Sequence, residues 1–247
     1  MKLPPSRERI LLMGSPGTGK TKQLLDVAAY LEDIDKGIEI IDLEDKISAY
    51  IKSSGLMPTK MELQVALTWD DLIDALDKIE SRIKPDSWIG IDRIDLAWEY
   101  VQRWYTNKRY EETLASKIMS TAISMGKKKS MFVPRFDEGS WQVINENYTE
   151  FIGGVLYRTR CNIILTAGIK DAQSSIDIFG NLGVVPRGQK EIGHQPHSVF
   201  LLSQKKETSR SWTITTAKDL PGRKVFAGDT LFDFADQYLA EYYPGVA

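Results

Sequence analysis

The sequence predicts an α/β fold with a mostly parallel, helix-covered sheet and antiparallel strands added at its C-terminal edge. Short apolar runs alternate with helix-like stretches along most of the 247 residues, and this alternation is typical of a parallel sheet. A glycine-rich loop joins the first apolar run to the first helix-like stretch. The apolar runs after residue 198 are hairpin-like, which indicates the antiparallel additions. In such a sheet, a ligand is expected at the carboxyl ends of the strands.

The first half of the chain contains the clearest elements. Strands are expected at residues 10–13, 38–43, 63–67 and 88–92. A helix is expected over residues 22–31, where apolar residues recur at helical spacing. A second helix carries apolar residues from Leu72 to Ile83, and Thr68 and Asp70 offer N-cap chemistry before it.

The second half contains longer polar stretches. We expect a loop insertion around residues 104–148, whose middle portion from Glu111 to Met125 could be helical. Strands are expected at residues 161–166, 198–202, 211–216 and 224–226, and a helix at residues 231–240. Nothing resembles a linker, so we expect a single domain over residues 1–247, with a C-terminal hairpin plus helix over residues 198–247.

Composition limits the classes of partner. The net charge of −2 gives no global attraction to nucleic acid or anionic membranes, so any such binding must come from local basic patches. The single cysteine, Cys161, excludes an intramolecular disulfide, and its place before an apolar strand predicts a core residue. The N-terminus lacks the apolar region of a signal peptide, and no apolar run is long enough to span a bilayer. We therefore expect a cytoplasmic protein.

One motif carries specific chemistry. Residues 14–21 read Gly-x-x-x-x-Gly-Lys-Thr between an apolar run and a helix-like stretch. In that context, backbone N–H groups and the helix dipole face one anionic site. Lys20 can reach the β- and γ-phosphates of a nucleoside triphosphate, and the Thr21 hydroxyl can ligate Mg²⁺. The motif favours a phosphate-binding loop over a turn that merely resembles one; its residues are Gly14, Ser15, Pro16, Gly17, Thr18, Gly19, Lys20 and Thr21.

Hydrolysis further requires a bound Mg²⁺ and a water aimed at the γ-phosphate. Asp92 ends an apolar strand and is expected to hold the metal, with Asp95 as the second choice; either could instead cap the following turn. Glu44 emerges after the 38–43 strand, at the same edge of a parallel sheet as the phosphate loop. Its carboxylate could act as general base toward the water. Spacing alone fits a solvated loop acid equally well.

The order of these features resembles the RecA-like ATPase core: a phosphate loop, a strand ending in Asp-x-Glu, then a strand ending in Asp. The resemblance implies a RecA-like P-loop NTPase fold that hydrolyses ATP with Mg²⁺. It assigns the catalytic glutamate to Glu44 and places Thr166 where that family senses the γ-phosphate. The family usually has a glutamine or similar amide near that point, and this chain lacks it.

The resemblance extends into the last third of the chain. Residues 168–195 resemble the second DNA-binding loop of RecA and carry cations at Arg187 and Lys190. The segment with Lys218 and Arg223 resembles a strand-end element whose cations reach a neighbouring subunit's γ-phosphate, which implies a catalytic role in trans. Ordinary surface cations at a hairpin tip are the alternative.

A basic segment occupies the place of the first DNA loop. Residues 126–136 combine Lys127, Lys128, Lys129 and Arg135 with two phenylalanines. Cations can neutralise phosphates, and aromatic faces can stack on unpaired bases without reading sequence. A solvated lysine run is the alternative.

Together these features favour an ATP-dependent recombination protein that binds single-stranded DNA, closest to the RecA-like phage single-strand annealing proteins. We expect ATP and Mg²⁺ as cofactors, a homo-oligomer in the form of a ring or filament, no membrane partner, and the host cytoplasm as its location if a phage encodes it. The alternatives are a hexameric translocase or helicase-like motor, a nucleotide-dependent switch that binds a protein partner, and a small-molecule kinase.

Overall fold

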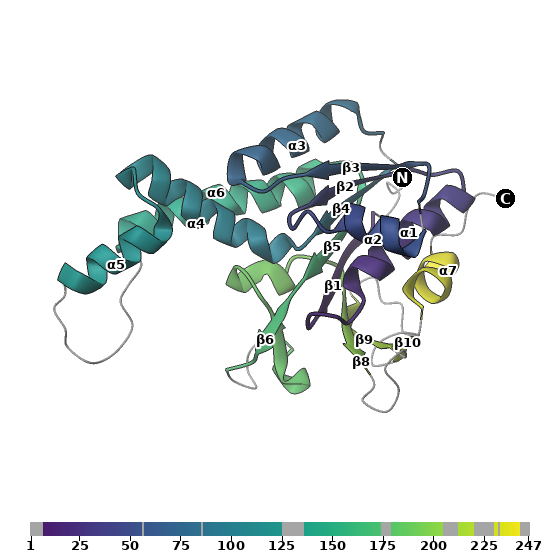
Figure 1. Ribbon diagram of the computed structural model, residues 1–247. Helices are drawn as coiled ribbons and strands as arrows, with labels where there is room; N and C mark the ends of the chain where they lie inside the picture. The colour runs from purple at the N-terminus through teal and green to yellow at the C-terminus, as the bar shows by residue number, and fades with distance from the viewer. Residues whose placement is uncertain are drawn as a thin grey trace, which may run out of the picture.

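A computed structural model of the chain describes residues 7–55, 57–84, 86–124, 136–173, 179–204, 212–219, 230–231 and 233–242. Within these residues, one sheet has the strand order β10-β9-β8-β1-β5-β4-β2-β3 (Figure 1). Its strands are β1 (Arg9–Gly14), β2 (Ile38–Asp42), β3 (Met61–Val65), β4 (Trp88–Asp92), β5 (Asn162–Ala167), β8 (Ser198–Gln204), β9 (Trp212–Asp219) and β10 (Thr230–Leu231). The strands from β8 to β3 are parallel, and β9 and β10 pair antiparallel at one edge. The predicted α/β fold class is confirmed.

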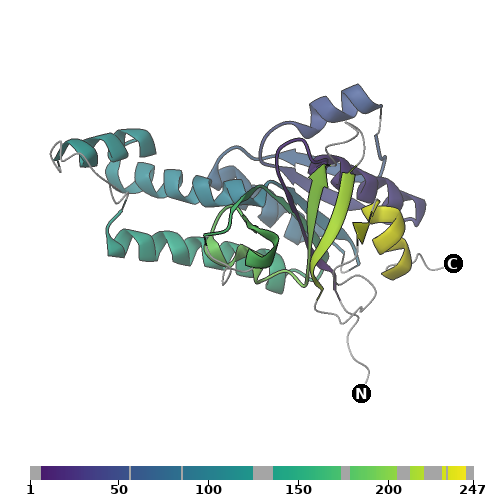
Figure 2. The same ribbon diagram turned by 90° about the horizontal axis from the view of Figure 1, so that it is seen from below.

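Helices cover both faces of the sheet (Figures 1 and 2). Because side chains alternate along a strand, Leu11 and Met13 of β1 face one core, and Ile10 and Leu12 face the other. The first core lies under α3 (Trp69–Arg82), α4 (Ile94–Tyr110) and α6 (Glu138–Gly153). The second lies under α1 (Lys20–Asp33), α2 (Ile47–Ser54) and a C-terminal π-helical turn, η4 (Ala235–Leu239), which α7 (Ala240–Tyr242) follows.

A capping box fixes the start of α3. Thr68 Oγ1 accepts a hydrogen bond from the Asp71 backbone N–H, and the Asp71 carboxylate accepts one from the Thr68 N–H, both at 3.1 Å. Thr68 is therefore the N-cap, as its place before the apolar stripe predicts. Its reciprocal partner is Asp71, three residues further on, rather than Asp70.

The predicted loop insertion around residues 104–148 is wrong for its described part. α4 runs to Tyr110, α5 covers Leu114–Ser124, and α6 begins at Glu138. In Figure 1, these three helices project together away from the sheet. The buried Ala97, Val101 and Tyr105 of α4 recur at helical spacing, but its many aromatic residues have low helix propensity and hid the pattern.

The C-terminal segment also differs from expectation. The strand predicted at residues 224–226 lies outside the described residues. The helix predicted over residues 231–240 begins later, because Leu231 pairs with Ile214 as part of β10. Its buried Phe234 and Tyr238 pack against Phe200 with ring centroids 4.9 Å apart in each pair. No helix in the described part of the chain is long and apolar enough to cross a membrane.

Candidate active site

The phosphate loop connects β1 to α1 at the carboxyl edge of the parallel strands. Gly17 and Gly19 have φ angles of 80° and 85°, in the left-handed region that favours glycine. A Cβ on Gly14 would lie 2.5 Å from Thr18 Oγ1 and 2.7 Å from the Leu202 carbonyl oxygen. α1 starts after Gly19 without a side-chain cap. The N–H groups of its first turn therefore suit the oxygens of a phosphate.

Lys20 lies over this loop. Its Nζ donates hydrogen bonds to the carbonyl oxygens of Gly14 and Ser15, at 2.8 and 2.9 Å. Burial lowers the pKa of Lys20 and the charge of Arg93 lowers it further, whereas three carboxylates raise it, namely Asp92, Asp95 and Glu44. These electrostatic partners place the predicted acidic residues at the rim that carries the phosphate loop.

Asp92 joins the loop helix to two strands. Its Oδ2 accepts a hydrogen bond from Thr21 Oγ1 at 2.9 Å, and its Oδ1 accepts one from Thr166 Oγ1 of β5. The side chain is 1% exposed, and this burial raises the pKa of its carboxyl group, although the two hydroxyl donors oppose the shift. A cation beside Asp92 would offset the cost of burying its charge.

The donors at this point fit Mg²⁺ in the manner of a nucleotide site. Thr21 and Asp92 offer hard oxygen ligands, and Mg²⁺ commonly completes such a set with phosphate oxygens and water. Within the described residues, no cluster of three or more His, Cys, Asp or Glu side chains could hold a metal by itself. The hydroxyl–carboxylate pair beside the phosphate loop is therefore a fitting place for the ion.

Glu44 emerges at the same rim, two residues beyond β2. The preceding Asp42 is fully buried and fixes the turn, because its carboxylate accepts hydrogen bonds from the backbone N–H groups of Glu44, Lys46 and Ile47 at 2.7–2.9 Å. Parallel pairing aligns Asp42 of β2 with Asp92 of β4. Glu44 is thus held at the edge where Lys20 and Asp92 lie, which is the geometry expected for a catalytic carboxylate.

Sequence reasoning missed Arg93. Its Nη1 donates to Glu44 Oε1 at 2.8 Å, while its Nε and Nη2 donate to the two oxygens of Asp95 at 3.1 and 2.8 Å. Asp95 is therefore an ion-pair partner and not a free second choice for the metal. The signal in the sequence is a cation directly after Asp92, but spacing alone could not tell that it faces Glu44.

The predicted second DNA loop contains regular structure. β6 (Ile169–Asp171) and β7 (Val184–Pro186) form an antiparallel hairpin that rises from the end of β5, and two short 3₁₀ turns, η2 (Gly180–Leu182) and η3 (Lys190–Gly193), accompany it. Arg187 and Lys190 are both exposed beyond β7. The basic residues Lys127, Lys128, Lys129 and Arg135 lie outside the described residues, as does Arg223.

Lys218 lies on β9 next to Val199, near the start of β8, at the rim opposite the phosphate loop. Its Nζ donates to the carbonyl oxygens of His194 and Pro196 at 2.6 and 2.7 Å. It cannot reach the phosphate loop of its own chain. Its role in trans stays a prediction.

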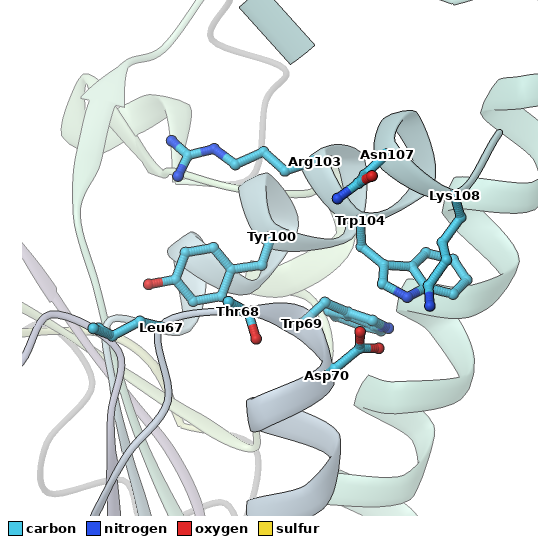
Figure 3. A pocket seen from close by; sticks show the side chains of 9 residues that line it. All are labelled: Leu67, Thr68, Trp69, Asp70, Tyr100, Arg103, Trp104, Asn107 and Lys108. Atoms are coloured by element: carbon cyan, nitrogen blue, oxygen red, sulfur yellow. The ribbon is translucent and has the colours of Figure 1, made fainter. Parts of the chain in front are cut away.

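A separate pocket lies where α3 begins beside α4 (Figure 3). It has a volume of about 410 Å³ and is lined by Leu67, Thr68, Trp69, Asp70, Tyr100, Arg103, Trp104, Asn107 and Lys108. Tyr100 Oη donates to the Leu43 carbonyl oxygen at 2.6 Å, which ties this wall to the turn before Glu44. None of the lining residues belongs to the phosphate loop, so the pocket is distinct from the triphosphate site.

Fold and site together define a RecA-like P-loop ATPase. A model of the family described as "AAA domain" matches residues 6–192. The chain therefore belongs to that AAA domain family. Among solved structures, the ATPase domain of a helicase aligns over 91% of this chain and 80% of its own length, with 12% identity and a TM-score of 0.47. No curated protein matched the chain.

Proposed function

We propose that this ATPase binds single-stranded DNA and serves recombination by strand annealing of the phage type, with residues 1–247 acting as a single ATPase domain. The observation that carries the proposal is the cationic β6–β7 hairpin at the rim of the ATP site. Exposed Lys170, Arg187 and Lys190 lie on or beside it. A groove of about 510 Å³ between this hairpin and α4 is lined in part by Lys170, Arg187 and Trp98, a combination that suits phosphates and unpaired bases.

The ATP site divides its work among few residues. Thr21 and Asp92 would hold Mg²⁺, which supplies positive charge at the β- and γ-phosphates when bound. Lys20 would exchange its contacts with the loop carbonyls for phosphate oxygens. Glu44 would take a proton from the attacking water as that oxygen bonds to the γ-phosphorus and the bond to the β-phosphate oxygen breaks.

Replacement of Glu44 by glutamine tests the catalytic assignment. Glutamine keeps the size of the side chain but cannot take up the proton, so steady-state phosphate release should fall by about a hundredfold or more. ATP affinity, measured with a fluorescent analogue, should be retained. Glu99→Gln is the matched control, since Glu99 lies on the exposed face of α4 and pairs with Arg103 one turn along the same helix. Normal hydrolysis by Glu44→Gln would contradict the assignment.

DNA binding is tested by fluorescence anisotropy with labelled oligo-dT, with and without ATP. We expect binding that weakens with added salt, and a smaller salt dependence in the double variant Arg187→Ala, Lys190→Ala, because each cation lost removes a phosphate contact. Absence of salt-sensitive binding in the unaltered protein would instead favour a nucleotide-dependent switch.

The assembly is proposed as a homo-oligomer. Because Lys218 lies at the rim remote from its own phosphate loop, a second copy is needed if it is to reach a γ-phosphate. Arg223 would act beside it. Closed rings in negative-stain images would favour a translocase or helicase-like motor, and filaments or smaller oligomers would favour annealing.

A further inference from the structure

Arg93 has a backbone conformation that few residues with a Cβ adopt. It directly follows Asp92 and has a φ angle of 72°, in the left-handed region. Its N–H donates to Thr166 Oγ1 at 2.8 Å, so a side chain of the neighbouring strand anchors this conformation. The strained turn places the guanidinium group at the rim of the ATP site, where it meets two carboxylates.

One end of this contact network is the proposed general base. Arg93 Nη1 donates to Glu44 Oε1 at 2.8 Å, and the side chains are only 19% and 20% exposed. Such a partly buried, charge-assisted hydrogen bond holds a carboxylate more firmly than a surface pair does. A positive neighbour also favours the ionised carboxylate and makes it a weaker base. Arg93 therefore opposes proton transfer from water to Glu44.

The other end reaches the hairpin. Asp95 is 4% exposed, and its Oδ1 accepts a hydrogen bond from the Gly168 N–H at 3.1 Å in addition to its contact with Arg93. Gly168 in turn accepts a hydrogen bond from the Arg187 N–H at 2.8 Å. A Cβ on Gly188 would lie 3.2 Å from Asp95 Cα. Both the entry to the β6–β7 hairpin and the exit from it therefore rest on Asp95.

We propose that Arg93 is a positioning residue that restrains Glu44 and couples it to the β6–β7 hairpin. Single-stranded DNA on the hairpin shifts Gly168 and Asp95, the guanidinium group follows Asp95, and Glu44 is released toward the attacking water. This inference rests on the proposed function, because it takes DNA as the ligand of the hairpin.

Arg93→Ala tests the restraint. In steady-state assays, the kcat for ATP without DNA should rise about tenfold, the factor that one charge-assisted hydrogen bond contributes to an equilibrium, and the KM for ATP should stay unchanged. Oligo-dT should then stimulate the variant little. The matched control is Arg82→Ala, because Arg82 likewise bridges two carboxylates, those of Glu39 and Glu62, but does so far from the phosphate loop. Its DNA-free rate and its stimulation should equal those of the unaltered protein.

A DNA-free kcat that is unchanged or lower in Arg93→Ala, with normal ATP affinity, would overturn the proposal. Arg93→Lys serves if the alanine variant does not fold, since lysine keeps the charge but loses the two-pronged contact with Asp95; its DNA-free rate should also rise. If oligo-dT neither binds nor stimulates the unaltered protein, the proposed function fails, whereas the DNA-free rates still decide whether Arg93 restrains Glu44.

Discussion

At the scale of single residues, Asp92 sets stability against function. Burial raises the pKa of its carboxyl group above the ordinary 3.8. The unfolded chain therefore loses this proton at a lower pH than the folded chain does. The contribution of Asp92 to stability is largest below pH 3.8 and falls as the pH rises toward the folded-state pKa. At neutral pH, the ionised carboxylate opposes folding.

Asp92→Asn should therefore be more stable than the unaltered protein in the absence of nucleotide, by on the order of 1 kcal/mol at pH 7. Hydrolysis that depends on Mg²⁺ should be lost, because a neutral amide is a poor ligand for a hard cation. Thermal unfolding followed by circular dichroism and phosphate release measure the two effects. A variant that is less stable at pH 7 but normally folded would contradict the sign.

Cys161 gives a second pH dependence. The thiol is 1% exposed, which confirms the predicted core residue, and burial raises its pKa from 9.0 to about 11. Its contribution to stability should be complete below pH 9 and should be lost as the pH rises from 9 to 11, by up to about 2 kcal/mol. Urea unfolding at about pH 8 and about pH 11 measures this loss. Cys161→Ala should lose less stability over the same interval; an equal loss would assign the effect to other groups.

At the scale of elements, strand ends and helix starts place the reactive groups. The ends of β1, β4 and β5 and the turn after β2 meet at one rim, while caps decide where the covering helices begin. The capping box of α3 is the clearest cap, because both of its hydrogen bonds are made by Thr68 and Asp71.

Thr68→Ala should lower the free energy of unfolding by about 1 kcal/mol, since it leaves N–H groups at the start of α3 without their side-chain acceptor. Urea unfolding measures the change. Ser81→Ala near the end of the same helix is the control, because the Ser81 hydroxyl is exposed and donates to the Lys78 carbonyl oxygen of its own helix; its effect should stay within about 0.5 kcal/mol. Equal effects of both substitutions would remove the cap as the cause.

At the scale of the whole molecule, the sheet separates two hydrophobic cores and carries the ATP site on its carboxyl rim. The loop, α1 and the strands beneath it come together only in the folded chain. Ligand binding at this rim is therefore coupled to global unfolding.

ATP with Mg²⁺ at about a hundred times its dissociation constant should raise the free energy of unfolding by about 2.7 kcal/mol. Differential scanning calorimetry over a series of ATP concentrations measures the shift in Tm. Lys20→Ala should show little shift at the same concentrations, because it removes the ammonium group that contacts the phosphates. A concentration-dependent shift of the same size in Lys20→Ala would contradict the assigned site.

The sequence by itself determined the fold class, the strand at residues 88–92 and the phosphate loop. In these segments, the signals are local: glycine positions, a short apolar run and helical spacing. It failed for the helices between residues 94 and 153, where aromatic residues that pack α4 against α6, such as Trp98 against Trp141, obscure the helical pattern.

Only the tertiary structure decided the surroundings of Glu44. Its contact with Arg93 joins residues 49 positions apart and exists because β2 and β4 pair in parallel, with Asp42 beside Asp92. The same holds for the contact of Asp95 with Gly168, which lies 73 positions along the chain. No local pattern specifies such contacts, because they depend on strand order and register, which the packing of the whole sheet determines.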